Sequence, residues 1–150
     1  TGGLHSRLFI KDKIIDLPII QGKKTTGANS IAIKNKKKFI VVGGDFNTPD
    51  SIYKNCVITS DGGSTWKYPS VAPHGYRSCV EFINKNNWIT CGLNGVDITN
   101  DNGYTWKWVS KESFNVCRIA KIGRTVYLAG NNGKVAKLDY QFDDRRRKLN

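Results

Sequence analysis

Residues 57–66 read VITSDGGSTW, and residues 97–106 read DITNDNGYTW. The second segment begins 40 residues after the first, and Asp, Gly and Thr-Trp occupy the same positions in both. A fixed period of this length is typical of repeat architectures, in which each copy forms one supersecondary unit. The pair of segments therefore predicts a domain built from repeats.

The surroundings of the two segments repeat as well. Each unit of about 40 residues contains four short runs rich in β-branched and aromatic residues, separated by Gly, Asn and Asp, as expected for strands joined by turns. No stretch has the periodicity of an amphipathic helix. Four strands in about 40 residues correspond to one blade of a β-propeller. The sequence therefore predicts an all-β fold of four-stranded antiparallel blades.

About three blades are expected in this chain. The expected units are the outer strands of one blade at residues 6–20, complete blades at 29–70 and 77–110, and a last blade that ends after its third strand near Tyr140. We assign residues 1–140 to the propeller domain and residues 141–150 to a basic C-terminal tail. Residues 45–55 have the character of a loop inserted into the first complete blade, where binding surfaces often evolve.

Each repeated segment is expected to form the hairpin between the third and fourth strands of a blade. Its Asp can accept backbone N–H bonds within the turn, its Gly can adopt positive φ, and its Trp can bury a large ring between neighbouring blades. The residues concerned are Thr59, Asp61, Gly63, Trp66, Thr99, Asp101, Gly103 and Trp106. We interpret all of them as structural, because the ladder of oxygen ligands that a calcium-binding loop requires is not present.

The repeated segments match the Asp-box pattern Ser/Thr-x-Asp-x-Gly-x-x-Trp, and the chain as a whole resembles one bacterial group of Asp-box, or BNR-repeat, propellers. That group is related to the photosystem II assembly and stability factors and is often labelled only "oxidoreductase". The matching segments are residues 26–27, 30–32, 42–46, 59–66, 75–78, 92–95 and 130–138, so that the resemblance covers about residues 1–140. Residues 10–14 depart from the pattern as a degenerate box without Gly and Trp.

The resemblance implies the C-terminal part of a closed, seven-bladed propeller whose preceding segment supplies the missing blades. It implies no established catalytic activity. The label "oxidoreductase" has no support in these residues, because there is no Gly-x-Gly-x-x-Gly fingerprint and no haem or flavin motif. The chain also lacks Met and begins in what reads as the middle of a strand. We therefore expect part of a longer product with an extracytoplasmic location.

No cofactor or metal is predicted. The cysteines Cys56, Cys79, Cys91 and Cys117 have no CxxC or Cys/His spacing, and His5 and His74 are the only histidines. All four cysteines lie in apolar strand-like runs, which favours buried free thiols. Cys79 and Cys91 flank an expected hairpin at nearly opposite positions, so a cross-strand disulfide is the alternative.

Our leading hypothesis is a non-enzymatic interaction or assembly propeller that presents loops and its channel to a protein partner. The candidate channel-mouth residues are Asp45, Tyr76, Arg77 and Arg118. For Tyr76 and Arg77 a packing and hydrogen-bonding role on an innermost strand competes with a binding role.

Two other functions remain as alternatives. A sialidase-type glycoside hydrolase needs an arginine triad, for which Arg7, Arg77, Arg118 and Arg124 are available, but the Arg-Ile-Pro signature is missing. A polyanion-binding module, with nucleic acid or an acidic glycan as partner, would use the basic loops that give the net charge of +12. The lysines and arginines gather in expected turns and in the tail, which is also typical of solvated loops.

No apolar run is long enough to span a membrane.

Overall fold

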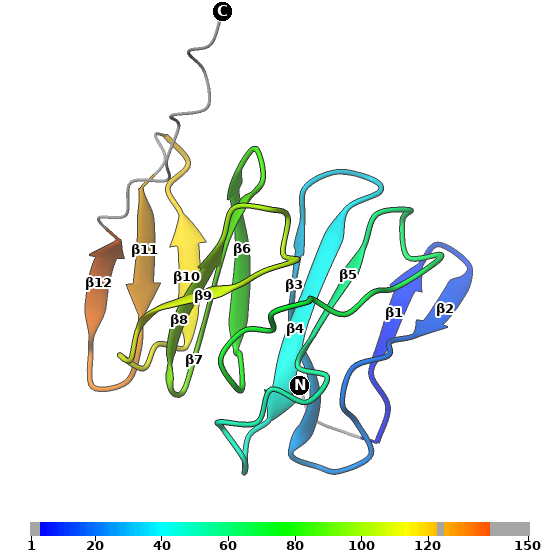
Figure 1. Ribbon diagram of the computed structural model, residues 1–150, viewed down its shortest axis with the longest axis horizontal. Helices are drawn as coiled ribbons and strands as arrows, with labels where there is room; N and C mark the ends of the chain where they lie inside the picture. The colour runs from blue at the N-terminus through cyan, green and yellow to red at the C-terminus, as the bar shows by residue number, and fades with distance from the viewer. Residues whose placement is uncertain (1–3, 123–124, 139–150) are drawn as a thin grey trace, which may run out of the picture.

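A computed structural model describes residues 4–122 and 125–138 of the chain. Within them the chain forms only strands and connecting loops, arranged in four antiparallel sheets that stand side by side in chain order (Figure 1). The sheets are β1 (Arg7–Ile10) with β2 (Lys13–Asp16); β3 (Thr26–Ile33), β4 (Phe39–Asp45) and β5 (Cys56–Thr59); β6 (Cys79–Asn84), β7 (Asn87–Gly92), β8 (Gly95–Thr99) and β9 (Lys107–Ser110); and β10 (Val116–Ile119), β11 (Val126–Ala129) and β12 (Val135–Leu138). The prediction of an all-β fold made of antiparallel units is confirmed.

The expected complete blade over residues 29–70 differs from the prediction in its fourth strand. Only the single bridge between Ile58 and Lys67 represents that strand, whereas the equivalent pair in the next unit, Ile98 with Lys107, belongs to the full strand β9. Pro69 stands where β9 has Val109. Because proline has no backbone N–H to donate, the ladder stops before it.

The last sheet has the expected three strands, β10 to β12. The expected end of its third strand near Tyr140, and the basic tail of residues 141–150, lie outside the described residues.

Three apolar layers hold the four sheets together, one between each successive pair. The first contains Leu17, Ile19, Val41 and Val57; the second contains Ile40, Ile58, Trp88 and Trp106 among others; the third contains Ile89, Ile98, Phe114 and Leu128 among others. The first strands of neighbouring sheets also touch, β3 against β6 and β6 against β10. We call β3, β6 and β10 the inner strands.

The turns at residues 59–66 and 99–106 share one hydrogen-bond pattern. In the first turn, the Asp61 carboxylate accepts from the Thr65 N–H at 2.9 Å and the Thr65 hydroxyl at 2.6 Å, and the Thr59 hydroxyl donates to it at 2.8 Å. In the second, Asp101 accepts from Thr105 in the same way at 2.9 and 2.5 Å. The Gly63 and Gly103 N–H groups donate to Thr59 and Thr99.

Each turn delivers its tryptophan to the layer shared with the preceding sheet. Trp106 is buried in the second layer, and Trp66 is half-buried against the first. Gly103 has φ +89°, and a Cβ placed on it would lie 2.5 Å from Cδ1 of Ile40, a buried residue of the preceding sheet. A side chain at position 103 would therefore have to displace Ile40 and also adopt a left-handed backbone conformation.

We expect Gly103→Ala to lower the free energy of unfolding by about 1–3 kcal/mol, because it combines a left-handed backbone with overpacking against Ile40. Gly133→Ala is the matched control, since Gly133 also has positive φ, +70°, but a Cβ there meets nothing within 4 Å. Urea unfolding of both variants measures the difference. Equal losses would show that the contact with Ile40 carries no cost.

The Asp61 turn also predicts acid sensitivity. The hydroxyl and N–H of Thr65, with the hydroxyl of Thr59, lower the pKa of Asp61 to about 2. A carboxyl whose pKa is depressed on folding stabilises the fold above its unfolded pKa, and this stability is lost as pH falls from about 4 towards 2. Asp61→Asn keeps an acceptor for the Thr65 N–H but does not titrate. We expect the urea midpoint of the variant to fall less than that of the wild type over this range; parallel curves would contradict the assignment.

Candidate functional site

Three connecting segments meet at one end of the second and third sheets. They are the β4–β5 loop at residues 46–55, the segment at residues 70–78 that leads into β6, and the β7–β8 turn at residues 93–94. We call this end the loop face. The Tyr76 N–H donates to the Pro49 carbonyl at 2.7 Å, and the Asn94 amide donates to the same carbonyl at 3.0 Å. One carbonyl in the loop of the second sheet thereby holds two segments of the third sheet.

Two further features tighten the loop face. The buried Asn55 amide donates to the carbonyls of Pro73 and Gly75 at 2.8 and 2.7 Å. A Cβ on Gly75, whose φ is +82°, would lie 1.9 Å from the Pro49 oxygen, so only glycine fits there. The loop face is therefore a hydrogen-bonded platform and not a set of independent loops.

Arg77 lies beneath this platform with none of its surface exposed. Its guanidinium forms a buried ion pair with Asp97, with Nε 2.8 Å from Oδ2, and Nη1 donates to Asn94 Oδ1 at 2.6 Å and to the Tyr76 carbonyl at 2.9 Å. Burial lowers the pKa of Arg77, and the Asp97 carboxylate opposes that shift. Asp97 also accepts from the His74 N–H at 3.2 Å. Arg77 thus supports the loop face from below. Its charge is paired with Asp97 and is not exposed at the surface.

Asp45 has a comparable supporting position at the end of β4. It is buried, and its Oδ1 accepts from the Asn47 N–H at 3.0 Å. This backbone hydrogen bond, followed by one from the Thr25 side chain, lowers the pKa of Asp45. The carboxylate therefore caps the turn that carries Phe46.

Aromatic side chains cover the outside of the platform. Phe46 is 54% exposed and meets the half-buried Tyr76 edge to face, with ring centroids 5.8 Å apart. His74 stacks on Trp108 at 3.9 Å, and the Lys111 ammonium lies 5.6 Å from the Trp108 ring centre. We call Phe46, His74, Tyr76 and Trp108 the aromatic surface. Such side chains bury large areas at little conformational cost and are enriched in protein interfaces.

Arg118 lies apart from this surface, on the inner strand β10. Its side chain is 63% exposed, and Nη1 is 3.0 Å from Glu81 Oε2 on β6 and 3.1 Å from Cys79 Sγ. Of the four predicted channel-mouth residues, the structure brings together Asp45, Tyr76 and Arg77 at the loop face. It places Arg118 against the neighbouring inner strand instead.

The arginines considered for a sialidase triad are dispersed. Arg7 pairs with Asp16, Arg77 with Asp97 and Arg118 with Glu81, each within or beside a different sheet. Arg124 lies outside the described residues. Among the residues that the structure does describe, no converging set of arginines forms a carboxylate site.

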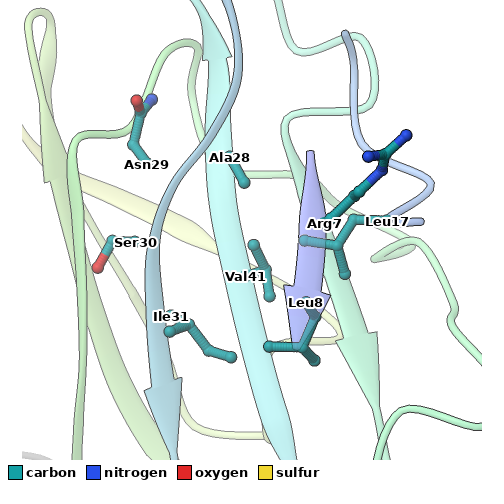
Figure 2. A pocket seen from close by; sticks show the side chains of 8 residues that line it. All are labelled: Arg7, Leu8, Leu17, Ala28, Asn29, Ser30, Ile31 and Val41. Carbon is teal, nitrogen blue, oxygen red and sulfur yellow. The ribbon is translucent and has the colours of Figure 1, made fainter. Parts of the chain in front are cut away.

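An apolar groove of about 160 Å³ lies between β1 and the inner part of the second sheet (Figure 2). It is lined by Arg7, Leu8, Leu17, Ala28, Asn29, Ser30, Ile31 and Val41. The side chains of Leu8, Ile31 and Val41 come from three different strands to line it. The one charged residue, Arg7, is already paired with Asp16. The groove can accept apolar side chains but offers no acid–base pair for chemistry.

Sequence reasoning missed the groove and most of the aromatic surface. A signal for Trp108 was present, because Tyr68 occupies the same position one repeat earlier, two residues after the tryptophan. The stacking of His74 on Trp108 left no pattern in the sequence, because these two residues are distant in sequence.

No group of three or more His, Cys, Asp or Glu side chains in residues 4–122 and 125–138 is arranged to hold a metal ion. The same residues include no helix long and apolar enough to cross a bilayer.

Comparison with known proteins supports the fold class. No protein-family model matches the chain, and no curated protein does so either. A solved structure described as "YCF48 bound to D1 peptide" is similar, with a TM-score of 0.56, 13% identity and coverage of 86% of this chain. The chain spans 42% of that structure's length. Together with the four sheets, the similarity shows that the chain is built from blades of a β-propeller.

The buried pair beneath the loop face leads to a prediction about stability. Asp97→Leu or Arg77→Met alone should each lower the free energy of unfolding by about 3–5 kcal/mol, because each leaves an unpaired buried charge. The double variant should recover most of that loss. Arg7→Ala, which breaks the exposed pair with Asp16, should cost less than about 1 kcal/mol. Chemical denaturation measures all four, and additive single losses would show that the pair is not coupled.

Proposed function

We propose that this chain forms part of a non-enzymatic β-propeller whose loop face binds a protein partner. The observation that carries the proposal is the aromatic surface of Phe46, His74, Tyr76 and Trp108, which is held on a platform of hydrogen bonds between loops of two sheets. Binding surfaces gain affinity when their side chains are ordered before the partner arrives. Here Pro49, Asn94 and Arg77 supply that order.

The chemistry of the surface favours a protein segment with apolar or aromatic side chains. Phe46, Ile52 and Tyr53 are each more than half exposed on the same loop or at its start, and Lys54 and Lys111 flank aromatic rings. Aromatic rings with nearby lysines suit a segment that combines apolar anchors with acidic residues. The similar structure binds a peptide according to its description, which is consistent with this proposal.

The finer assignments belong to the same proposal. The turns at residues 59–66 and 99–106 are Asp-boxes with wholly structural roles, because every polar group of Asp61 and Asp101 described above is used within its own turn. The whole protein is a closed propeller of seven blades, of which this chain supplies about three. Its role is assembly or scaffolding through the bound partner.

The test begins with peptides selected on the folded chain from a phage-displayed random library. Tyr76→Ala should weaken binding of the selected peptides about tenfold or more, because truncating a central aromatic anchor commonly costs over 1 kcal/mol. Tyr127→Ala is the matched control, since Tyr127 is an exposed aromatic residue on β11, outside the loop face. Fluorescence anisotropy with labelled peptides measures the affinities.

Equal affinities of the Tyr76→Ala and wild-type chains would refute the loop face as the binding site. Salt dependence separates the polyanion alternative. Binding anchored by aromatic contacts, with two lysines nearby, should weaken only modestly when salt is raised, whereas binding of a polyanion by many lysines falls steeply with salt.

A further inference from the structure

Three of the four cysteines gather in the layer between the third and fourth sheets. Cys79 lies on β6, Cys91 on β7 and Cys117 on β10, and their exposed fractions are 3%, 0% and 0%. All are free thiols. Cys56, the fourth, lies in a different layer with Trp88 and Trp106.

Cys79 and Cys91 are direct partners in the register of β6 and β7. Residues directly opposite one another in antiparallel strands have Cα atoms about 4.5–5.5 Å apart. That separation falls within the range of about 4.4–6.8 Å found in disulfides. Cys117 reaches the same place from the neighbouring sheet, and the Cys79 Sγ lies 3.4 Å from the Cys117 carbonyl oxygen.

Arg118 distinguishes Cys79 from the other thiols. Its Nη1 lies 3.1 Å from Cys79 Sγ, while the rest of the side chain reaches solvent. A guanidinium at hydrogen-bonding distance stabilises a thiolate, which is the reactive form of cysteine. Hydrogen bonds with the thiols of Cys117 and Cys91 lower the pKa of Cys79, burial opposes them, and the charge of Arg118 adds a smaller lowering. Cys56 instead lies fully buried in the second layer beside Trp88 and Trp106, and burial raises its pKa.

We propose that Cys79 is a redox-reactive thiolate, stabilised by Arg118, which forms a disulfide with Cys91 on reaction with a hydroperoxide. Arg118 is an exposed side chain lying on the buried sulfur, so that its displacement opens a short path for a small oxidant. The proposal is independent of the loop face and of any partner.

The chemistry takes two steps. The Cys79 thiolate attacks one oxygen of hydrogen peroxide, the O–O bond breaks, and the departing hydroxide takes up a proton to leave as water, which makes Cys79 a sulfenic acid. The Cys91 thiol then attacks the Cys79 sulfur, gives up its proton and displaces the sulfenic oxygen as a second water. Two thiols are oxidised and one peroxide is reduced. Arg118 then retains Glu81 and the Cys117 carbonyl as acceptors.

The sequence makes the linkage directly readable. Trypsin cleaves after lysine and arginine, which places each cysteine in its own peptide: residues 55–67, 78–85, 86–107 and 112–118. The folded chain is treated with hydrogen peroxide, its remaining thiols are alkylated under denaturing conditions, and the digest is analysed by mass spectrometry.

We expect peptide 78–85 to be joined to peptide 86–107, to separate on reduction with dithiothreitol, and to leave Cys56 and Cys117 alkylated. A linkage of 78–85 to 112–118, or alkylation of Cys79 at peroxide concentrations that oxidise glutathione, would overturn the proposal. This readout uses the wild-type chain, so it does not depend on whether a cysteine variant folds.

Variants of the exposed Arg118 test its part. Arg118→Gln should slow disulfide formation roughly tenfold, because Cys79 loses the guanidinium that stabilises its thiolate, and Arg118→Lys should restore part of the rate. Arg7→Gln is the matched control, because Arg7 is an exposed, ion-paired arginine on the first sheet, and its rate should equal that of the wild type. If Arg118→Gln reacts as fast as the wild type, Arg118 does not activate Cys79.

Discussion

The hydrogen-bonded turn around each repeated aspartate is the constraint on which the stacking of the sheets depends. One carboxylate accepts hydrogen bonds from the hydroxyl and the N–H of the threonine four residues later, and these bonds within the turn close it. The closed turn places a glycine against the preceding sheet and a tryptophan in the shared layer. Local hydrogen bonding is thereby converted into packing between sheets, which is why the pattern recurs in successive units.

The loop face shows how such a stack can carry a binding surface. Loops at the end of a sheet have few apolar contacts of their own, and their backbone groups need other partners. Arg77 and Asn94 meet that need from below, with Asp97 balancing the buried charge. Phe46 and Tyr76 can then remain at the surface without disordering the loops. In the proposed binding surface, the charged residues support the loops and the exposed side chains are aromatic.

The proposed thiol chemistry depends on the same layered construction. Cys79 and Cys91 face each other because β6 and β7 are register partners, and Cys117 joins them because β10 packs against both strands. Arg118 reaches over from the next inner strand to the Cys79 sulfur. The site therefore exists only when two successive sheets are stacked.

By itself, the sequence determined the repeat unit, the strands and the turns, because these depend on interactions within a few residues. The period of 40 residues, the alternation of apolar residues and the Asp, Gly and Trp positions are all local signals. It also placed Cys79 opposite Cys91, since the register of a hairpin follows from its turn. Only the tertiary structure decided which charged side chains are exposed at the surface. Arg77 and Arg118 both lie near apolar strand-like runs in the sequence. Arg77 is buried against Asp97, whereas Arg118 is exposed beside Glu81 and Cys79. Burial, ion pairing and the His74–Trp108 stack depend on contacts between distant segments, and single-sequence patterns do not encode such contacts.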